Sequence, residues 1–184
     1  MNQPTVAELI HRSRLNDLEA FGLLVEQHQS FVYSVAFRLL CDDENAKDAA
    51  QETFIRVWKN IGRFREEMRF TTWLYKITTN LCYDHIKSEK RRNNHVVPVI
   101  EKSELMNLAS DENIETALIN SELAIAIRFL TEQLTTKQKL VFTLRELEGL
   151  EVEEISKITG LSPGKIKSNL YCARQSIRAK LEKM

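Results

Sequence analysis

The sequence has little of what turn-rich and membrane-spanning proteins contain. Five glycines and three prolines in 184 residues are few for a sheet protein, whereas the helix-favouring residues Leu, Ile, Ala, Glu and Lys are abundant. No segment approaches the roughly 18 uninterrupted apolar residues of a membrane span, and the first ten residues do not resemble a secretory signal. We therefore expect an all-α fold without membrane insertion.

The residue patterns of metal centres and redox sites are also absent. The three cysteines, Cys41, Cys82 and Cys172, are isolated and form no C-x-x-C pair. We predict reduced thiols in small buried or half-buried positions of a cytoplasmic protein, with redox or zinc sensing as the alternative. The four histidines lack metal-ligand spacing, and there is no glycine-rich phosphate loop. We expect no enzyme, no metal site, no cofactor and no small-molecule substrate.

The sequence as a whole has no excess of positive or negative charge, but one sign dominates in two of its segments. Lys plus Arg and Asp plus Glu both number 26, whereas a free DNA-binding protein usually carries a strong positive excess. Residues 93–120 hold five acidic side chains against Lys102, and residues 163–184 hold six basic side chains against Glu182. Because the positive charge is local, we expect weak binding to DNA without a partner that holds the chain there.

Hydrophobic periodicity predicts two helical blocks separated by a linker. The first block, up to residue 92, has helical patterns over 5–27, with a break at Asn16 and Asp17, and over 31–40. A third helix follows Asp42 and ends at Gly62, and a fourth is capped by Thr71 or Thr72.

The rest of the chain divides in the same way. Residues 93–120 are acidic, contain Pro98 and lack a strong period, although a helix could begin near Glu112. The last block shows four helical patterns, over 123–134, 136–147, 152–158 and 163–183. We predict two small helical domains, 1–92 and 121–184, joined by a flexible acidic linker, 93–120.

The segment Val152–Leu170 has the pattern of a helix-turn-helix. Its short first helix ends at Gly160, a residue suited to the left-handed position after a helix, and Ser162 and Pro163 suit the start of the next one. An ordinary helical hairpin with a solvated basic face is the alternative. The outward face can reach phosphates and base edges; it carries Lys165, Lys167, Ser168, Asn169, Tyr171 and Gln175.

The same region and two earlier stretches carry a more specific resemblance. The stretches are DAAQETFIRVWKNIGRF (48–64), FTTWLYKITTNLCYDHIKSEKRR (70–92) and LTTKQKLVFTLRELEGLEVEEISKITGLSPGKIKSNLYCAR (134–174). In this order they resemble the extracytoplasmic-function sigma factors. The resemblance implies a sigma factor that binds core RNA polymerase and directs promoter-specific transcription initiation. Its first domain (region 2) would recognise and help melt the minus-ten element, and its second (region 4) would bind the minus-thirty-five element.

The resemblance also implies a polymerase-binding helix within the first domain. In the family this helix docks on a coiled coil of the largest polymerase subunit. A solvated face with ordinary ion pairs one helical turn apart, such as Glu52 with Arg56, is the alternative. The implied contact residues are Asp48, Gln51, Glu52, Ile55, Arg56 and Lys59.

For the minus-ten element, the resemblance places a pocket for a flipped-out base at the loop of residues 63–70. Phe64 and Phe70 could instead be hydrophobic plugs beneath this loop, and we expect Trp58 and Trp73 to pack in the core or an interface. The following helix would lie along the non-template strand. The implied DNA-binding residues are Arg63, Phe64, Arg65, Arg69, Lys76, Asn80, Tyr83, Asp84, Lys87, Arg91 and Arg92.

The recognition helix departs from the family pattern. Where relatives often have a Lys/Arg-Ser-Arg run followed by Arg-Ala-Arg, this chain has Asn169 and Cys172 in place of two cations. Asn169 could read an adenine with its side-chain amide. The implied contacts to the minus-thirty-five element are Ser162, Lys165, Lys167, Ser168, Asn169, Tyr171, Arg174 and Arg178.

The family implies further partners and leaves two rival functions. Its members are usually held inactive by an anti-sigma factor, which we expect here. A stand-alone helix-turn-helix regulator would bind duplex DNA tightly without polymerase. A helical interaction protein without a DNA role would show no salt-dependent affinity for DNA.

Overall fold

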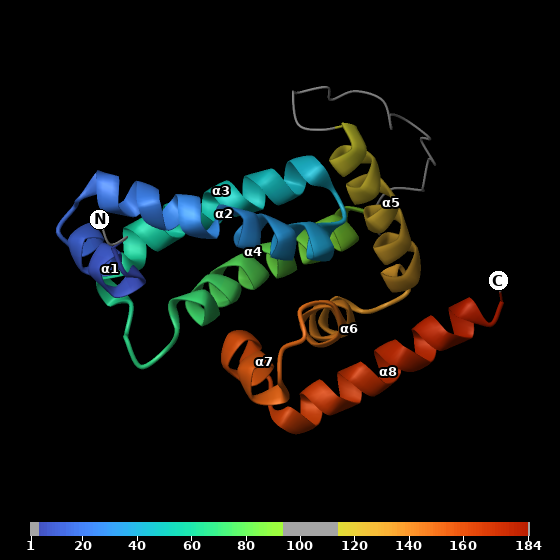
Figure 1. Ribbon diagram of the computed structural model, residues 1–184. Coiled ribbons are helices and arrows are strands. Elements are labelled where there is room, and N and C mark those ends of the chain that lie inside the picture. The colour runs from blue at the N-terminus through green and yellow to red at the C-terminus, as the bar shows by residue number, and fades with distance from the viewer. Residues whose placement is uncertain (1–3, 94–113, 184) are drawn as a thin grey trace.

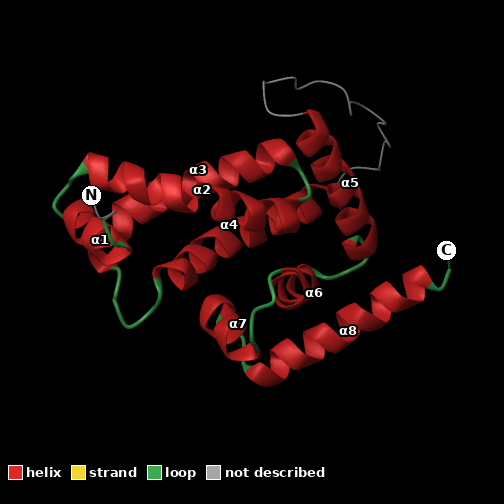
Figure 2. Ribbon diagram, in the orientation of Figure 1, coloured by secondary structure: helices red, strands yellow, loops and turns green. Residues whose placement is uncertain are grey.

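The computed structural model describes residues 4–93 and 114–183 of the chain (Figure 1). All regular structure in these two ranges is helical, as Figure 2 shows. The all-α fold expected from composition is therefore confirmed.

The first half of the chain forms a bundle whose long helices lie side by side. Helices α2, α3 and α4 pack against one another, and α1 packs against α2 at one end (Figure 1). A short 3₁₀ turn and a loop connect α3 to α4. The N-terminal helices are α1 (Val6–Arg14), α2 (Leu18–Leu40), α3 (Asp43–Asn60), the 3₁₀ turn (Ile61–Arg63) and α4 (Phe70–Asn93).

Local sequence signals explain how α1 and α2 are separated. Thr5 and Glu8 form a capping box at the start of α1. Asn16 has a φ angle of 63°, a left-handed conformation that Asn tolerates, and the Asp17 carboxylate accepts a hydrogen bond from the Ala20 N–H to cap α2. The break predicted at Asn16 and Asp17 is thus confirmed.

Two predicted boundaries are wrong. Helix α2 runs without interruption through residues 27–31, because no glycine or proline breaks it and buried Val32 continues the apolar face of Leu24. Helix α4 begins at Phe70, so Thr71 and Thr72 lie in its first turn and do not cap it. The Phe70 ring is buried in the N-terminal cluster, which holds the first turn of α4 in place.

The C-terminal helices follow the predicted order. A π-turn extends α6, and Gly149 and Gly160 both take left-handed φ angles, 70° and 71°. The Ser162 hydroxyl caps α8 by accepting from the Lys165 N–H. The helix-turn-helix pattern is confirmed. The elements are α5 (Ile114–Thr131), α6 (Thr136–Phe142), the π-turn (Thr143–Leu147), α7 (Val152–Thr159) and α8 (Pro163–Leu181).

Residues 94–113, which include most of the expected acidic linker, lie outside the described ranges. Helix α5 begins at Ile114, close to the start foreseen near Glu112 and before the end of the segment assigned to the linker. The domain boundaries 1–92, 93–120 and 121–184 stay a prediction.

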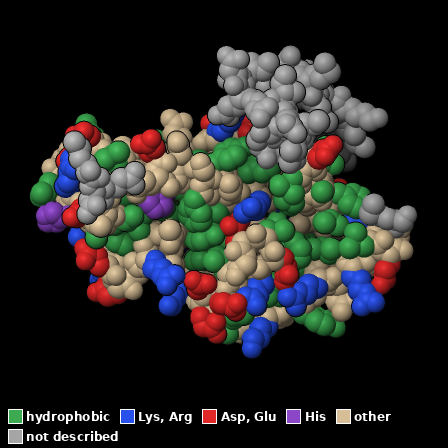
Figure 3. Space-filling model, viewed as in Figure 1, with side chains coloured by type: hydrophobic (Ala, Val, Ile, Leu, Met, Phe, Trp, Pro, Cys, Tyr) green, Lys and Arg blue, Asp and Glu red, His purple; other side chains and the backbone are tan. Residues whose placement is uncertain are grey.

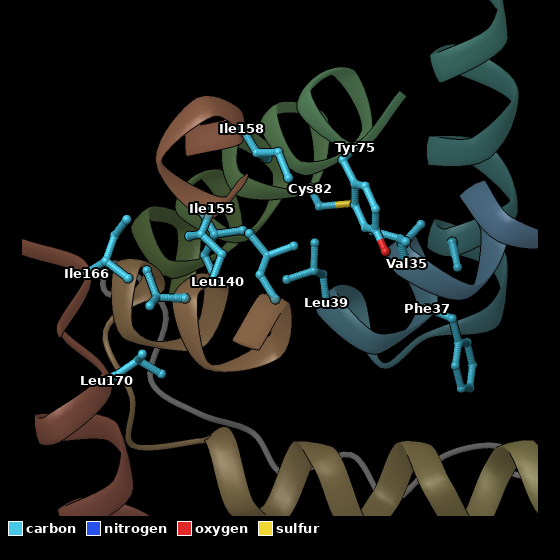
Figure 4. Packing of buried hydrophobic residues seen from close by; sticks show 14 residues of the cluster. Val35, Phe37, Leu39, Tyr75, Cys82, Leu140, Ile155, Ile158, Ile166 and Leu170 are labelled. Carbon is cyan, nitrogen blue, oxygen red and sulfur yellow. The ribbon is translucent and has the colours of Figure 1, made fainter. Parts of the chain in front are cut away.

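Buried side chains of the described residues form a cluster within the N-terminal helices, a second that joins the two halves of the chain, and a small third one within the C-terminal helices. The first surrounds Leu24, Val57 and Leu74, all fully buried. The second, seen in Figure 4, joins side chains of α2 and α4 to those of α6 and α7, on which α8 packs in turn. The two helical units are therefore in direct contact. Labelled members of the second cluster are Val35, Phe37, Leu39, Tyr75, Cys82, Leu140, Ile155, Ile158, Ile166 and Leu170.

We predict that Leu74→Ala destabilises the fold by about 2–5 kcal/mol, because it leaves a cavity at a fully buried position between α2 and α4. Urea unfolding followed by circular dichroism measures the change. Leu18→Ala, at a side chain 70% exposed, is the control and shifts the free energy of unfolding by less than about 0.5 kcal/mol. Equal effects of the two substitutions would contradict the packing described here.

Candidate nucleic-acid interface

Helix α8 presents a basic outer face because its apolar face is buried. Ile166, Leu170, Ala173 and Ile177 pack inward, which turns the intervening positions to solvent. Figure 3 shows Lys and Arg side chains along the edge formed by α8, and acidic side chains beside them over α7. Of the residues predicted for the minus-thirty-five element, Asn169 is half-buried; the others, Ser162, Lys165, Lys167, Ser168, Tyr171, Arg174 and Arg178, are exposed.

The cations of this face differ in their present contacts. Arg174 donates to Glu146 Oε1 at 2.6 and 3.1 Å, and Arg178 donates to Glu182 at 2.8 Å. No ion pair of Lys165 or Lys167 occurs within the described part of the chain. The two lysines can therefore meet phosphates directly, whereas the two arginines would first exchange a carboxylate partner.

A second polar strip runs along α4. Lys76, Asn80, Asp84 and Lys87 follow helical spacing on the side opposite buried Leu74, so they share one face. This strip continues into the basic end of the helix and into the preceding loop. The predicted minus-ten residues that are exposed are Arg63, Arg65, Arg69, Lys76, Asn80, Asp84, Lys87, Arg91 and Arg92, and Tyr83 is half-buried.

Phe64 does not lie where a base could stack on it. It is 6% exposed, and its ring centroid lies 5.6 Å from that of Phe70 and 5.1 Å from that of Trp73. Phe70 is equally buried. Both rings therefore pack as hydrophobic plugs beneath the loop, the alternative to stacking on a base. Trp58 packs on Phe21 at 4.8 Å, in line with its expected packing role. The assignment of Phe64 to the minus-ten contacts stays a prediction.

An open cavity lies where the α4 strip meets α3 and the 3₁₀ turn. Sequence reasoning identified Arg56, Arg63 and Asn80, but it did not place them together. The other three lining residues lie three or four positions from a neighbouring lining residue within α3 or α4. This helical spacing could have shown that they share a face. The cavity has a volume of about 300 Å³ and is lined by Arg56, Asn60, Arg63, Trp73, Ile77 and Asn80.

Arg14 of α1 organises the loop between α3 and α4, a role that sequence reasoning missed. Its guanidinium donates to the Phe64 carbonyl at 2.6 Å and the Ile61 carbonyl at 3.4 Å. It also pairs with Glu66 at 3.2 Å. The Arg14 guanidinium thus holds both the backbone and a side chain of the loop. No local sequence pattern predicts a contact between residues about 50 positions apart.

The outer face of α3 is accessible. Ile55 is 39% exposed, an apolar group within a polar strip, and Arg56 donates to Glu52 at 2.8 Å. The ion pair foreseen in the alternative reading is therefore present, and the strip remains open to a helical partner. Asp48, Gln51, Arg56 and Lys59 are exposed, and Glu52 is half-buried.

The cysteines lie in two kinds of environment, and the expectation of buried or half-buried positions is wrong for Cys172, which is exposed. Cys41 and Cys82 are buried and Cys172 is exposed, and all three are free thiols. Burial raises the pKa of Cys41 and raises that of Cys82 to about 12, the opposite of an activated thiolate. Residues 4–93 and 114–183 contain no cluster of metal-ligating side chains and no helix able to cross a membrane.

Two family models match the chain in order along its length. Sigma-70 region 2 matches residues 24–92, and Sigma-70 region 4 matches residues 124–177. The first match runs from residue 24 within α2 through α3 and the loop to residue 92 of α4, and the second runs from residue 124 within α5 to residue 177 within α8. The two exposed polar strips thus lie in the two matched regions.

Similar proteins match over nearly their whole length. The RNA polymerase sigma-H factor of Pseudomonas aeruginosa is 30% identical over 99% of this chain and 96% of that protein. The ECF RNA polymerase sigma-E factor of Escherichia coli is 31% identical over 98% of this chain and 96% of that protein.

Among solved structures, CnrH in complex with the cytosolic domain of CnrY matches with a TM-score of 0.65 and 20% identity, covering 95% of this chain and 96% of CnrH. RpoE with the anti-sigma factor NepR from Bartonella quintana matches with a TM-score of 0.62 and 19% identity, over 88% and 96%.

We predict that Arg14→Ala loosens the loop and not the bundle. Loss of the carbonyl contacts speeds amide hydrogen exchange of residues 61–66 by about tenfold, equivalent to about 1.4 kcal/mol of local stability. Glu66→Gln, which removes only the exposed ion pair, changes exchange by less than about threefold. Unchanged exchange in Arg14→Ala would show that another contact holds the loop.

Proposed function

Because the chain belongs to the extracytoplasmic-function sigma factors, we propose that it binds core RNA polymerase and directs it to promoters through two DNA-contacting strips. The observation that carries the proposal is the order of regions 2 and 4 along the chain, each with an exposed polar strip. The protein is a transcription initiation factor, and the polymerase performs the chemistry. Its place of action is then the cytoplasm.

The α4 strip and the loop suit the minus-ten element. Lys87, Arg91 and Arg92 form the basic end of α4 and suit phosphates more than bases. The cavity combines the apolar faces of Trp73 and Ile77 with donors from Arg56, Asn60 and Asn80. Stacking surface beside hydrogen-bond donors is what an unstacked base requires, since capture must offset a few kcal/mol of lost stacking. We place the base in this cavity; Phe64 supports it from below.

The α8 strip suits duplex DNA at the minus-thirty-five element. A helix of 19 residues with one exposed face fits the major groove, and Lys165 and Lys167 lie near its N-terminal end, where base edges come within reach. Asn169 currently donates from Nδ2 to the Lys165 carbonyl at 2.7 Å. Its amide would turn outward to pair with an adenine.

The polymerase-binding surface in this proposal is the outer face of α3. Ile55 supplies an apolar contact, and the flanking residues of both charge signs, such as Asp48 and Lys59, suit a partner helix that also mixes charges. Zero formal net charge makes this partner necessary, because the few local cations release too few counterions to hold DNA alone.

An anti-sigma factor is a further proposed partner. Structures that match this fold include a sigma factor bound to an anti-sigma factor, NepR. Purification of the chain from uninduced cells is expected to bring down such a protein in a fixed ratio. A free monomer in those cells would count against this partner.

Transcription in vitro tests the proposed function. The full chain is added to purified core RNA polymerase on a template library with randomised upstream DNA, and transcripts are sequenced. We expect new start sites that share two spaced elements and that depend on both proteins. A chain that binds single duplex sites tightly without polymerase, and adds no start sites, would be a stand-alone helix-turn-helix regulator. No salt-dependent DNA binding in any mixture would indicate an interaction protein.

Two substitutions on α8 separate base reading from phosphate binding. Asn169→Ala is expected to relax the preference at one upstream base pair by about 1–3 kcal/mol and to leave the salt dependence unchanged. Lys167→Ala is expected to weaken all promoters about equally and to lower the salt slope of binding by about one. Promoter selection by the polymerase holoenzyme measures both. Unaltered base preference in Asn169→Ala would rule out the adenine contact.

A further inference from the structure

Helix α1 lies before the residues that the region 2 model matches, yet it reaches the part of the molecule that we assign to base capture. The match begins at residue 24, whereas α1 ends at Arg14, beside the start of the loop that joins α3 to α4 (Figure 1). The cavity between α3, the 3₁₀ turn and α4 is called the base cavity below. Arg14 is not among its lining residues, so it can act on a bound base through other residues.

Helix α1 is a fixed support because its apolar face is buried. Leu9 and Ile10 are both buried in the N-terminal cluster. The Ser13 hydroxyl is buried as well and donates to the Leu9 carbonyl at 2.7 Å. Arg14 comes one helical turn after Ile10, so its side chain leaves α1 on the side of this buried residue. The Arg14 side chain therefore extends from a well-defined position.

Arg14 fastens both ends of the 3₁₀ turn. Its Nε donates to the Ile61 carbonyl at 3.4 Å, and its Nη2 donates to the Phe64 carbonyl at 2.6 Å. A 3₁₀ turn of three residues has few hydrogen bonds of its own, among them one from the Phe64 N–H to the Ile61 carbonyl at 3.2 Å. The position of the turn therefore depends on contacts from outside it, and the Arg14 guanidinium supplies two.

The turn in turn positions two groups that line the base cavity. Arg63, its last residue, lines the cavity, and no ion pair of Arg63 occurs in the parts of the chain that the structure describes. The reach of this side chain into the cavity thus follows the backbone of the turn. The Phe64 ring packs on Trp73 with the ring centroids 5.1 Å apart, and Trp73 forms part of the apolar wall. A displaced turn would change the spacing between the Arg63 donor and the Trp73 ring.

We propose that Arg14 is a positioning residue for minus-ten recognition, which sets the spacing between the Arg63 donor and the Trp73 ring, and thereby the base preference of the base cavity, without touching DNA. This role rests on the proposed function, because it requires a base in the cavity. It places part of the control over base preference in α1, outside the residues that the region 2 model matches.

The shape of the guanidinium, more than its charge, carries this role. Its third nitrogen, Nη1, pairs with the Glu66 carboxylate at 3.2 Å, so all three nitrogens of Arg14 have a partner in the turn or the loop. A lysine keeps the charge but not the planar fork, because its ammonium is a single point on a flexible stem. Arg14→Lys therefore separates positioning from simple attraction of DNA phosphates by a positive charge.

Trp73 reports base capture directly, because a base that stacks on its indole quenches its fluorescence. The sequence has two tryptophans, so a Trp58→Phe background leaves Trp73 as the only emitter. The probes are short single-stranded oligonucleotides that carry one base, A, C, G or T, between abasic units. The full chain is titrated with each of them at low salt, where phosphate attraction is strongest. The ratios of the dissociation constants measure the base preference.

In the Trp58→Phe background we expect one base to be preferred. Arg14→Lys is expected to lower the affinity for that base about tenfold and for the other bases less than about threefold, because a loosened site loses most for the base that fits it best. Arg12→Lys is the matched control, since it makes the same substitution on the same helix at a side chain that pairs with Asp17 at 2.8 Å. It is expected to leave the preference unchanged, and all variants are expected to unfold at the same temperature.

Promoter selection with core RNA polymerase completes the test. Arg14→Lys is expected to flatten the preference at one base of the downstream element and to leave the upstream element unchanged. An unaltered preference in Arg14→Lys, an equal loss for all bases, or wild-type binding without any preference would overturn the positioning role while the proposed function stands.

The remaining outcomes separate the positioning role from the proposed function. New start sites without quenching of Trp73 would put the captured base elsewhere and overturn the positioning role alone. Base-selective quenching that adds no start sites would count against the proposed function alone. If the wild-type chain neither responds to any oligonucleotide nor adds start sites, both fail.

Discussion

The structure depends on α4, because this single helix faces three different environments around its circumference. One side is buried in the N-terminal bundle through Leu74 and Thr78, and a second is covered by α6 and α7 through Tyr75 and Cys82. Only the third side, with Lys76 and its helical neighbours, faces water. A helix this enclosed has little freedom to shift, so the polar strip it carries is held in a fixed register relative to α3.

Local patterns predicted most of the fold and the exposed strips, and contacts across the chain supplied the rest. Helix caps such as Ser162 and left-handed positions such as Gly160 act within a few residues, so the sequence alone indicates them. The break foreseen between residues 27 and 31 failed because tertiary packing continued the helix. The hydrogen bond from Arg14 to the Phe64 carbonyl and that from Arg38 of α2 to the Glu148 carboxylate could not be foreseen, because the partners are 50 and 110 residues apart.

Charge placement explains why a chain of zero net charge can still act on DNA. Its cations gather on α8 and at the end of α4, and several carboxylates beside them, such as Glu146 and Glu182, hold arginines in internal pairs. In the proposed function DNA phosphates would compete with these carboxylates, so part of each new contact would replace an old one. In the proposed function the net gain would be small for each strip alone, so the affinity would come from one assembly that engages two sites at once.

The π-turn at residues 143–147 fixes the direction in which Glu148 points. A π-turn accommodates one more residue than an α-helical turn, so every side chain after it is rotated by about 100° relative to a regular continuation. In a homologous chain lacking that extra residue, the following carboxylate would point away from α2. The length of one turn thereby decides whether the Glu148 carboxylate reaches Arg38 and Tyr75 in the other half of this chain.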